Sequence, residues 1–213
     1  MNFLPEQIEN YSETHTSPES SVLKELNRKT YAQVLNPRML SGHLQGRLLA
    51  MFSRMIKPKR ILEIGTYTGY ATQCLAEGLA MDGAIDTLEK NVELKHIIDE
   101  YFAKSDLTNK INLHIGDALQ IIPELNFEYD LVFIDADKEN YSNYFDLIID
   151  KVSPGGFIIA DNVLWSGKVI EPLDEKDIDT KAIVAFNQKV HTDSRIFNLL
   201  LPVRDGLMVM QKI

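Results

Sequence analysis

Residues 60–70 read Arg60-Ile-Leu-Glu-Ile-Gly-Thr-Tyr-Thr-Gly-Tyr70, and this stretch decides the fold. A short apolar run ends in a turn with two glycines, and a segment of helical composition follows directly. An apolar strand that leads through a glycine turn into a helix is the opening unit of a parallel α/β sheet. We therefore expect a strand at 60–64 and a helix at 70–80.

Similar apolar runs recur along the chain at 84–88, 111–115, 129–134 and 156–160. They alternate with segments of helical composition at 92–105, 118–125 and 141–152, which predicts a parallel sheet covered on both faces. After a helix at 180–191, runs at 195–201 and 207–212 are joined by too few residues for a helical crossover, so this pair is predicted to be antiparallel. The expected fold is α/β, a Rossmann-like, doubly wound, mainly parallel seven-stranded sheet with an antiparallel C-terminal hairpin.

The first 57 residues are predicted to form a helical cover on this sheet. Ser17-Pro18-Glu19 is a helix-start signal for a helix that extends to about Leu35, and an amphipathic helix is expected at 43–56. Residues 162–179 are expected to form a long surface loop. We expect one domain, 1–213, with a helical cap at 1–57 and a core at 58–213, because ~150 residues is a typical domain size.

Composition narrows the possible functions. The chain has 213 residues, is 45% hydrophobic and 25% charged, and carries a net charge of −9, which argues against a nucleic-acid partner. Its single cysteine, Cys74, is predicted to be a buried structural thiol. The N-terminus lacks the features of a signal peptide and no apolar run reaches the ~18 residues of a membrane span, so we expect a cytoplasmic protein without a membrane partner.

Three successive predicted strand ends carry residues that suit a nucleotide-like ligand. Glu63 stands two residues before Gly65, where its carboxylate would repel a pyrophosphate but attract an ammonium and a sulfonium group, which points to S-adenosylmethionine. Glu89 follows the second strand and can accept both hydroxyls of a ribose. Small residues at 116–118 follow the third strand and leave room for an adenine ring. Each feature alone is more typical of a turn or a solvated strand end, but their joint placement favours the cofactor.

Two further strand ends carry oxygen ligands. Asp135-Ala-Asp-Lys138 follows the fourth strand, and Asp161-Asn162 follows the fifth. Two carboxylates and an amide oxygen at one edge of the sheet suit a hard cation such as Mg²⁺. Lys138 lies one helical turn past Asp135 and can remove a proton from a hydroxyl held there. The alternative is a helix cap and a surface ion pair.

These motifs resemble the class I S-adenosylmethionine-dependent, metal-dependent O-methyltransferases of the catechol and caffeoyl-CoA type, in their bacterial-type branch. The similar stretches, within residues 39–213, are Glu63-Ile-Gly-Thr-Tyr-Thr-Gly-Tyr70, Val132-Phe-Ile-Asp-Ala-Asp-Lys-Glu-Asn-Tyr141, Asp161-Asn-Val-Leu-Trp-Ser-Gly167 and Leu201-Pro-Val-Arg-Asp-Gly206. Two positions depart from common family patterns. Ala71 stands where many members carry a serine, and Asp137 stands where animal catechol enzymes carry a tryptophan.

The resemblance implies a role for each matching residue. The implied catalytic residues are Lys138, as general base, and Asp135, and the implied metal ligands are Asp135, Asp161 and Asn162. The implied cofactor-binding residues are Met39, Ser41, Glu63, Gly65, Thr66, Tyr67, Ala71, Glu89, Ala118 and Asp135. The implied substrate contacts are Lys138, Asn162 and Trp165. Arg204, Tyr11, His15 and Arg38 are weaker candidates for acceptor contacts, whereas His43 and His191 are expected to be structural.

The expected reaction transfers the methyl group of S-adenosylmethionine to a hydroxyl of a small vicinal aromatic diol, with a divalent cation (Mg²⁺, or Mn²⁺ or Ca²⁺) holding the diol. The resemblance also implies a homodimer. Two alternatives stay open at this point: an NAD-dependent Rossmann oxidoreductase and a non-catalytic S-adenosylmethionine-binding module. The acid before Gly65 and the absence of a third glycine count against the oxidoreductase.

Overall fold

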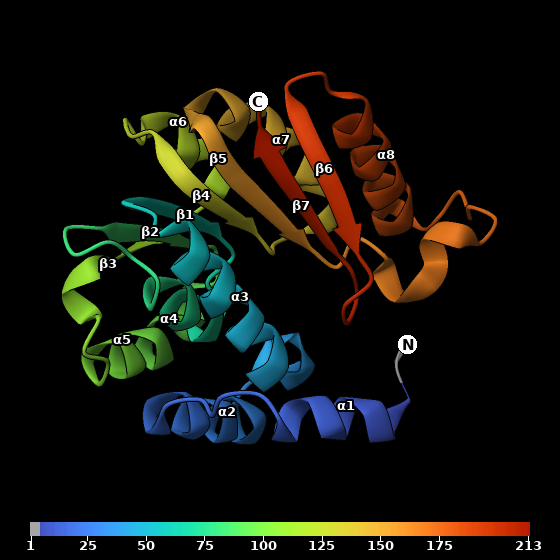
Figure 1. Cartoon of the computed structure of the whole chain (residues 1–213). Helices are drawn as coiled ribbons and strands as arrows, with labels where there is room; N and C mark the ends of the chain where they lie inside the picture. Colours follow the sequence, from blue (N-terminus) through green and yellow to red (C-terminus); the bar gives the residue numbers. More distant parts are fainter. Residues whose placement is uncertain (1–4) are drawn as a thin grey trace.

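The computed structural model describes residues 5–213 and contains a seven-stranded sheet in the order β3-β2-β1-β4-β5-β7-β6 (Figure 1). Its strands are β1 (Arg60–Ile64), β2 (Ala84–Glu89), β3 (Ile111–Ile115), β4 (Tyr129–Ile134), β5 (Val152–Asp161), β6 (Ile196–Leu201) and β7 (Leu207–Lys212). Strands β1 to β5 pair in parallel, and β7 pairs antiparallel with both β5 and β6. The predicted fold class, including its antiparallel C-terminal hairpin, is confirmed.

Helices lie on both faces of the sheet. They are α1 (Glu6–Thr14), α2 (Ser21–Gln33), α3 (Gly42–Ile56), α4 (Tyr70–Ala76), α5 (Lys95–Ala103), α6 (Ala118–Glu124), α7 (Tyr141–Ile148) and α8 (Ile178–Thr192). Short 3₁₀ helices occur at η1 (Pro37–Met39), η2 (Val92–Leu94), η3 (Thr108–Lys110), η4 (Lys138–Asn140), η5 (Ile149–Lys151) and η6 (Trp165–Ile170).

Strand β4 shows how the sequence builds two cores. Val132 and Ile134 point to the face packed by α6, α7 and α8, whereas Leu131 and Phe133 point to the face packed by α2, α3, α4 and α5. All four side chains are fully buried. A strand covered on both faces needs apolar side chains on both sides, which explains why 131–134 is a continuous apolar run.

The first helices differ from the prediction in where they begin. Helix α2 begins at Ser21, since the Ser20 hydroxyl accepts a hydrogen bond from the Leu23 amide at 3.2 Å, so the helix start expected at Ser17-Pro18-Glu19 is wrong. Helix α3 occupies 42–56 almost as predicted. Figure 1 shows α2 and α1 end to end along one edge, with α3 between them and the sheet.

Two other boundaries are also corrected. Strand β5 begins at Val152 rather than at 156, because α7 ends at Ile148 and a single 3₁₀ turn leads into the sheet. The predicted surface loop at 162–179 contains the 3₁₀ helix η6 and the first two residues of α8. The side chain of Asp177, which precedes α8, accepts a hydrogen bond from the Thr180 amide. Asp161 is consequently the last residue of β5 rather than the first residue after it.

Helices α3 and α4 approach each other closely. A Cβ atom on Gly46 would lie 2.6 Å from the Tyr70 ring and 2.8 Å from Cys74 Sγ. Cys74 is fully buried, and burial raises the pKa of its thiol to about 12, which fits the structural role predicted for it. None of the helices in residues 5–213 combines the length and the apolarity that crossing a membrane requires.

A substitution at Gly78, just after α4, tests how tightly the chain packs against α3. A Cβ atom there would lie 2.2 Å from the main-chain carbonyl carbon of Ser53, so Gly78→Ala must force α3 and α4 apart. We expect a loss of about 3 kcal/mol in the free energy of unfolding, measured by urea denaturation. Gly155→Ala is the control, since its Cβ meets no atom within 4 Å and only the left-handed backbone conformation is strained, at a cost of about 1 kcal/mol. Equal losses in the two variants would contradict the close packing.

Candidate active site

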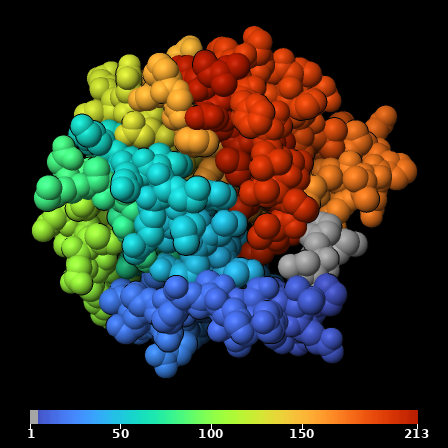
Figure 2. Space-filling view, in the orientation of Figure 1, coloured from blue at the N-terminus to red at the C-terminus, as the bar shows by residue number. Residues whose placement is uncertain are grey.

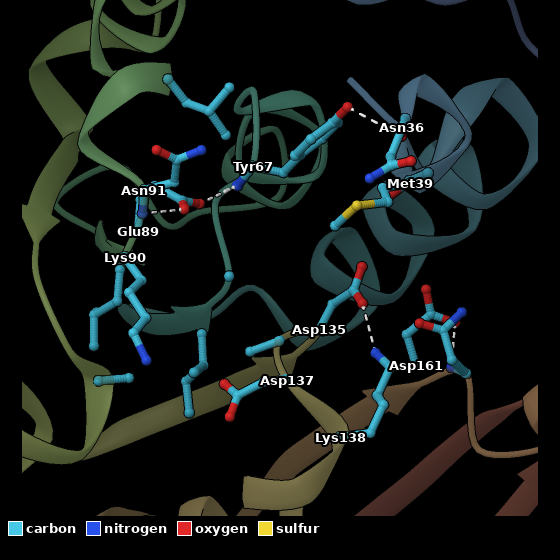
Figure 3. Close-up of a pocket in the computed structure, with 18 of the residues that line it drawn as sticks. Asn36, Met39, Tyr67, Glu89, Lys90, Asn91, Asp135, Asp137, Lys138 and Asp161 are labelled. Atoms are coloured by element: carbon cyan, nitrogen blue, oxygen red, sulfur yellow. Dashed lines mark hydrogen bonds and ion pairs between the residues drawn. The ribbon is translucent and has the colours of Figure 1, made fainter. Parts of the chain in front are cut away.

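A cavity of about 1080 Å³ opens at the carboxyl ends of the parallel strands (Figure 3). Its lining includes Gly65 after β1, Glu89 at the end of β2, Gly116 after β3, Asp135 after β4 and Asp161 at the end of β5. The strand ends predicted for a cofactor and for a metal therefore meet at a single cavity, whose lining includes Gly65 but not Glu63. Segment 33–41, which connects α2 to α3, also lines it.

Glu89 organises one end of the cavity. Its Oε2 accepts a hydrogen bond from the Tyr67 amide at 2.7 Å, and its Oε1 accepts one from the Asn91 amide at 2.7 Å (Figure 3). Burial nevertheless raises the pKa of Glu89 above its usual value. The Tyr67 hydroxyl donates to the main-chain oxygens of Leu35 and Asn36, so one residue joins Glu89 to segment 33–41.

Glu63 lies beneath the cavity wall and is fully buried. Its Oε2 accepts hydrogen bonds from the hydroxyls of Thr72 and Thr87, whereas its Oε1 has no hydrogen-bond partner within the described part of the chain. Burial raises the pKa of this carboxyl to about 8, even though the two threonine bonds act in the opposite direction. Glu63 does not line the cavity, so this oxygen belongs to the buried interior behind the ligand-binding surface.

Glycine at position 65 lets two strand ends meet. The Asp135 amide donates to the Ile64 oxygen at 2.9 Å, and a Cβ on Gly65 would lie only 2.0 Å from the Asp135 oxygen. Gly65 also has φ +102°, a conformation that side-chain-bearing residues rarely adopt. The turn after β1 and the turn after β4 are thereby held against each other.

Lys138 is 8% exposed and points into the cavity beside Asp135 (Figure 3). Its Nζ donates to Asp135 Oδ1 at 3.2 Å and to the Tyr141 hydroxyl at 2.6 Å. The Tyr141 hydroxyl in turn donates to the Asp161 main-chain oxygen at 3.0 Å. Burial, reinforced by the nearby carboxylates, raises the pKa of Tyr141 well above its usual value, so its hydroxyl stays protonated and keeps this arrangement.

Asp161 is buried at the end of β5 and accepts two hydrogen bonds. The Gln45 side-chain amide donates to Oδ2 at 2.5 Å, and the Asn162 main-chain amide donates to Oδ1 at 2.7 Å. Burial and the charge of Asp135 raise the pKa of Asp161 above its usual range. The unfavourable proximity of these two carboxylates is what a bound cation would relieve.

Trp165 forms part of the cavity wall next to Lys138, whose Nζ lies 5.8 Å from the centre of the indole ring. The tryptophan belongs to a turn in which residues 165, 166 and 167 all have positive φ. Asp205 holds this turn, because its side chain accepts from the Ser166 amide at 2.5 Å and its main-chain oxygen accepts from the Leu164 amide at 2.9 Å.

Most of the predicted site residues line this one cavity. They are Met39, Ser41, Gly65, Tyr67, Glu89, Ala118, Asp135, Lys138, Asp161, Asn162 and Trp165, with the weaker candidates Arg38 and Arg204. Glu63, Thr66 and Ala71 are buried and do not form its lining. Tyr11 and His15 stack on each other on exposed α1, outside the lining.

The histidines expected to be structural are bound within the chain. His43 contacts the Ser17 main-chain oxygen at 2.8 Å, and His191 contacts Asn198 Oδ1 at 3.3 Å. Neither residue lines the main cavity.

Comparison with known proteins gives this site a family. The family model described as O-methyltransferase matches residues 12–213. The chain belongs to the O-methyltransferase family. A caffeoyl-CoA O-methyltransferase of Medicago sativa is 33% identical over 217 residues, which cover 94% of this chain and 86% of the plant protein.

Solved structures agree with the assignment of this O-methyltransferase. An O-methyltransferase from Bacillus cereus in complex with S-adenosylhomocysteine superposes with a TM-score of 0.90 at 29% identity, covering 97% of both chains. A methyltransferase from Podospora anserina bound to the same molecule gives a TM-score of 0.90 at 30% identity, covering 100% of this chain and 99% of the other. The predicted resemblance and the predicted enzyme class, an S-adenosylmethionine-dependent O-methyltransferase, are confirmed, and the oxidoreductase and the non-catalytic module are set aside.

The residues present fit the two groups that the family implies. Glu89 lines the cavity with a carboxylate that two main-chain amides hold in place, and this arrangement fits the ribose hydroxyls of S-adenosylmethionine. No cluster of three or more His, Cys, Asp or Glu side chains with metal-ligating geometry occurs in residues 5–213. The candidate metal set has a different composition, two carboxylates and one amide, and that donor set suits a hard oxygen-seeking cation.

Three residues of the site were missed by the sequence analysis. Gln45 interrupts the apolar stripe of α3 one turn before Leu49, and a polar residue on a buried helix face was the available signal. Tyr141 and Asp205 fall inside quoted motifs, but their contacts join segments distant in sequence, which no local pattern indicates.

The raised pKa of the Glu63 carboxyl predicts that the stability of the protein depends on pH. Its pKa is about 8 in the folded protein against 4.5 for the ordinary carboxyl, so between these values the folded state binds more protons than the unfolded state. The contribution of Glu63 to stability is therefore lost as pH rises through this window, by an amount on the order of a few kcal/mol. Between pH 5.5 and pH 8, urea midpoints of the wild type should fall relative to those of Glu63→Gln. Glu128→Gln, at an exposed position, is the control, and its urea midpoints should change with pH as those of the wild type do. If the midpoints of all three proteins change with pH in parallel, the raised pKa of Glu63 is refuted.

Proposed function

We propose that this O-methyltransferase transfers the methyl group of S-adenosylmethionine to one hydroxyl of a small vicinal aromatic diol, with a divalent cation and Lys138 as general base. The observation that carries the proposal is the placement of Lys138 Nζ 3.2 Å from Asp135 Oδ1, in the same cavity as Asp161 and Asn162. A base within reach of an oxygen-ligand cluster is the arrangement that deprotonation of a chelated diol requires.

Binding of S-adenosylmethionine is supported by the two ends of the cavity wall. Glu89 lines the cavity and offers its carboxylate to the ribose hydroxyls. Met39 and Ser41 lie on the segment that the Tyr67 hydroxyl ties down, and they cover the methionine end of the ligand. The S-adenosylhomocysteine in the Bacillus cereus and Podospora anserina structures supports the same choice of cofactor.

Asp135, Asp161 and Asn162 would hold a divalent cation, Mg²⁺ first, with Mn²⁺ or Ca²⁺ as alternatives. When bound, such a cation supplies Lewis-acid chemistry that brings two diol oxygens together and makes a hydroxyl proton easier to remove. Lys138 takes this proton as the neutral amine and becomes the ammonium, and the Tyr141 hydroxyl and Asp135 hold its Nζ at the cavity surface. Trp165 packs beside the lysine and forms a wall for the flat aromatic ring.

The metal requirement can be tested by removal. EDTA treatment should abolish methyl transfer from labelled S-adenosylmethionine to catechol, and Mg²⁺ should restore it. Asp161→Ala should lose the response to Mg²⁺. A panel of catechol, caffeate, caffeoyl-CoA and flavonoids identifies the acceptor in the same assay. Full turnover in metal-free buffer would rule out the proposed role of the cation.

The base can be tested separately. Lys138→Met should lower kcat by roughly 10²–10⁴-fold, because the step loses general-base catalysis, while the calorimetric affinity for S-adenosylmethionine stays unchanged. Lys189→Met is the control, since Lys189 of α8 pairs with Asp146 of α7 at 2.6 Å and does not line the cavity. A kcat within twofold of the wild type in Lys138→Met would contradict the proposed base.

We also propose that the chain forms a homodimer through the uncovered side of its C-terminal strands. Phe197 and Leu199 on β6 are 68% and 54% exposed, and Met51 and Met55 of α3 are exposed as well. Figure 2 shows the α3 region, in cyan, and the C-terminal strands, in red, on the same face of the molecule. Exposed apolar groups of this size favour burial against another protein surface. Phe197→Asp should shift the sedimentation mass from twice 24.2 kDa toward 24.2 kDa; a monomeric wild type would disprove the assembly.

A further inference from the structure

Gln45 of α3 is bound at both ends of its carboxamide. The residue is 2% exposed. Its Nε2 donates to Asp161 Oδ2 at 2.5 Å, and its Oε1 accepts from Arg204 Nη1 at 2.8 Å. The three residues come from α3, from the end of β5 and from the turn between β6 and β7.

Arg204 determines which way the carboxamide points. A guanidinium group can only donate hydrogen bonds, so the oxygen of Gln45 must face Arg204. The amide nitrogen must then face Asp161, and a carboxylate can only accept from it. The reverse orientation would place oxygen against oxygen at Asp161 and nitrogen against nitrogen at Arg204. The chain from Arg204 through Gln45 to Asp161 therefore has a single direction of donation.

The contact fixes the Asp161 carboxylate without consuming its capacity to bind. Oδ2 accepts from Gln45 and Oδ1 accepts from the Asn162 amide, so both oxygens are held in place. Each carboxylate oxygen has two acceptor sites, so each retains one. Asp161 is only 4% exposed, and among the described residues these are the donors that orient it.

We infer that Gln45 is a positioning residue that holds Asp161 for the divalent cation, and that Arg204 sets the orientation of Gln45. The inference rests on the proposed function, because it assigns a task at the same metal site. Partners that hydrogen-bond to metal ligands fix the ligand geometry, and their loss typically lowers metal affinity by about 10–100-fold. Gln45 also explains how α3, a helix outside the alternating strand–helix core, takes part in the site.

The location of the pair supports this assignment. Gln45 and Arg204 line the main cavity, and both also line a second cavity of about 350 Å³ between the N-terminal helices and the turn at 202–206. The two side chains thus stand between the proposed metal site and the neighbouring cavity. Removing the carboxamide would free Asp161 to rotate and would open this partition at the same time.

The test measures Mn²⁺ binding by electron paramagnetic resonance, with S-adenosylhomocysteine present and without turnover. Gln45→Met keeps the length and shape of the side chain but removes both hydrogen bonds, and the Mn²⁺ dissociation constant should rise about 10–100-fold. Arg204→Met removes only the orienting bond, and the rise should be smaller, about threefold to tenfold. Calorimetric affinity for S-adenosylhomocysteine should stay within twofold, and kcat of Gln45→Met should recover at saturating Mn²⁺.

Ser53→Ala is the matched control. Ser53 is a buried polar residue of the same helix whose hydroxyl donates to the Leu75 oxygen, away from the cavity. Its Mn²⁺ affinity should equal that of the wild type, and an equal loss in Ser53→Ala would reveal general loosening of α3 and overturn the inference.

The remaining outcomes distinguish a failure of the Gln45 role from a failure of the metal site itself. Wild-type Mn²⁺ affinity in folded Gln45→Met overturns the role of Gln45 while leaving the metal site intact. If circular dichroism shows that Gln45→Met does not fold, unchanged Mn²⁺ affinity in Arg204→Met overturns it instead. A wild-type protein that binds no Mn²⁺ disproves the metal in the proposed function, and the positioning role falls with it.

Discussion

The main-chain contact between the ends of β1 and β4 is the constraint on which the rest of the site depends. Gly65 can approach the Asp135 oxygen only because it lacks a Cβ, and the Asp135 amide closes the contact by donating to Ile64. The turn after β1 carries the residues suited to a cofactor, and the turn after β4 carries Asp135 and Lys138. A shift of either turn would separate the methyl donor from the groups that prepare the acceptor, and positional precision is what methyl transfer needs.

The elements outside the alternating core complete the site rather than merely cover it. Helix α3 supplies Gln45, and the turn between β6 and β7 supplies Arg204 and Asp205. Asp205 holds the turn that carries Trp165, while Arg204 acts on Asp161 through Gln45. One hairpin turn is therefore connected both to the candidate metal ligands and to the wall of the acceptor cavity. The antiparallel pair β6 and β7 therefore closes the sheet and also supplies, through its turn, residues that contact the site.

Local sequence was sufficient for the fold and for the residues at the strand ends. Short, mostly apolar runs predicted the positions of β1 to β4 closely, and in β4 residues 131–134 are all apolar because this strand is buried on both faces. Sequence was insufficient at the start of α2, where Ser20 caps the helix in place of the predicted Ser17. It was also insufficient before Val152, where a single 3₁₀ turn leads from α7 into β5. The contacts of Gln45, Tyr141 and Asp205 were also out of reach, since each joins segments that only the folded chain brings together.

The single tryptophan of the chain gives the active-site cavity an intrinsic optical probe. Trp165 is partly buried and lines the cavity, and the centre of its ring lies 5.8 Å from Lys138 Nζ. Its fluorescence, excited at wavelengths where tyrosine does not absorb, reports from one place in the molecule only. Occupation of the cavity by an aromatic molecule can thus be followed in solution by emission intensity, without a label and without turnover.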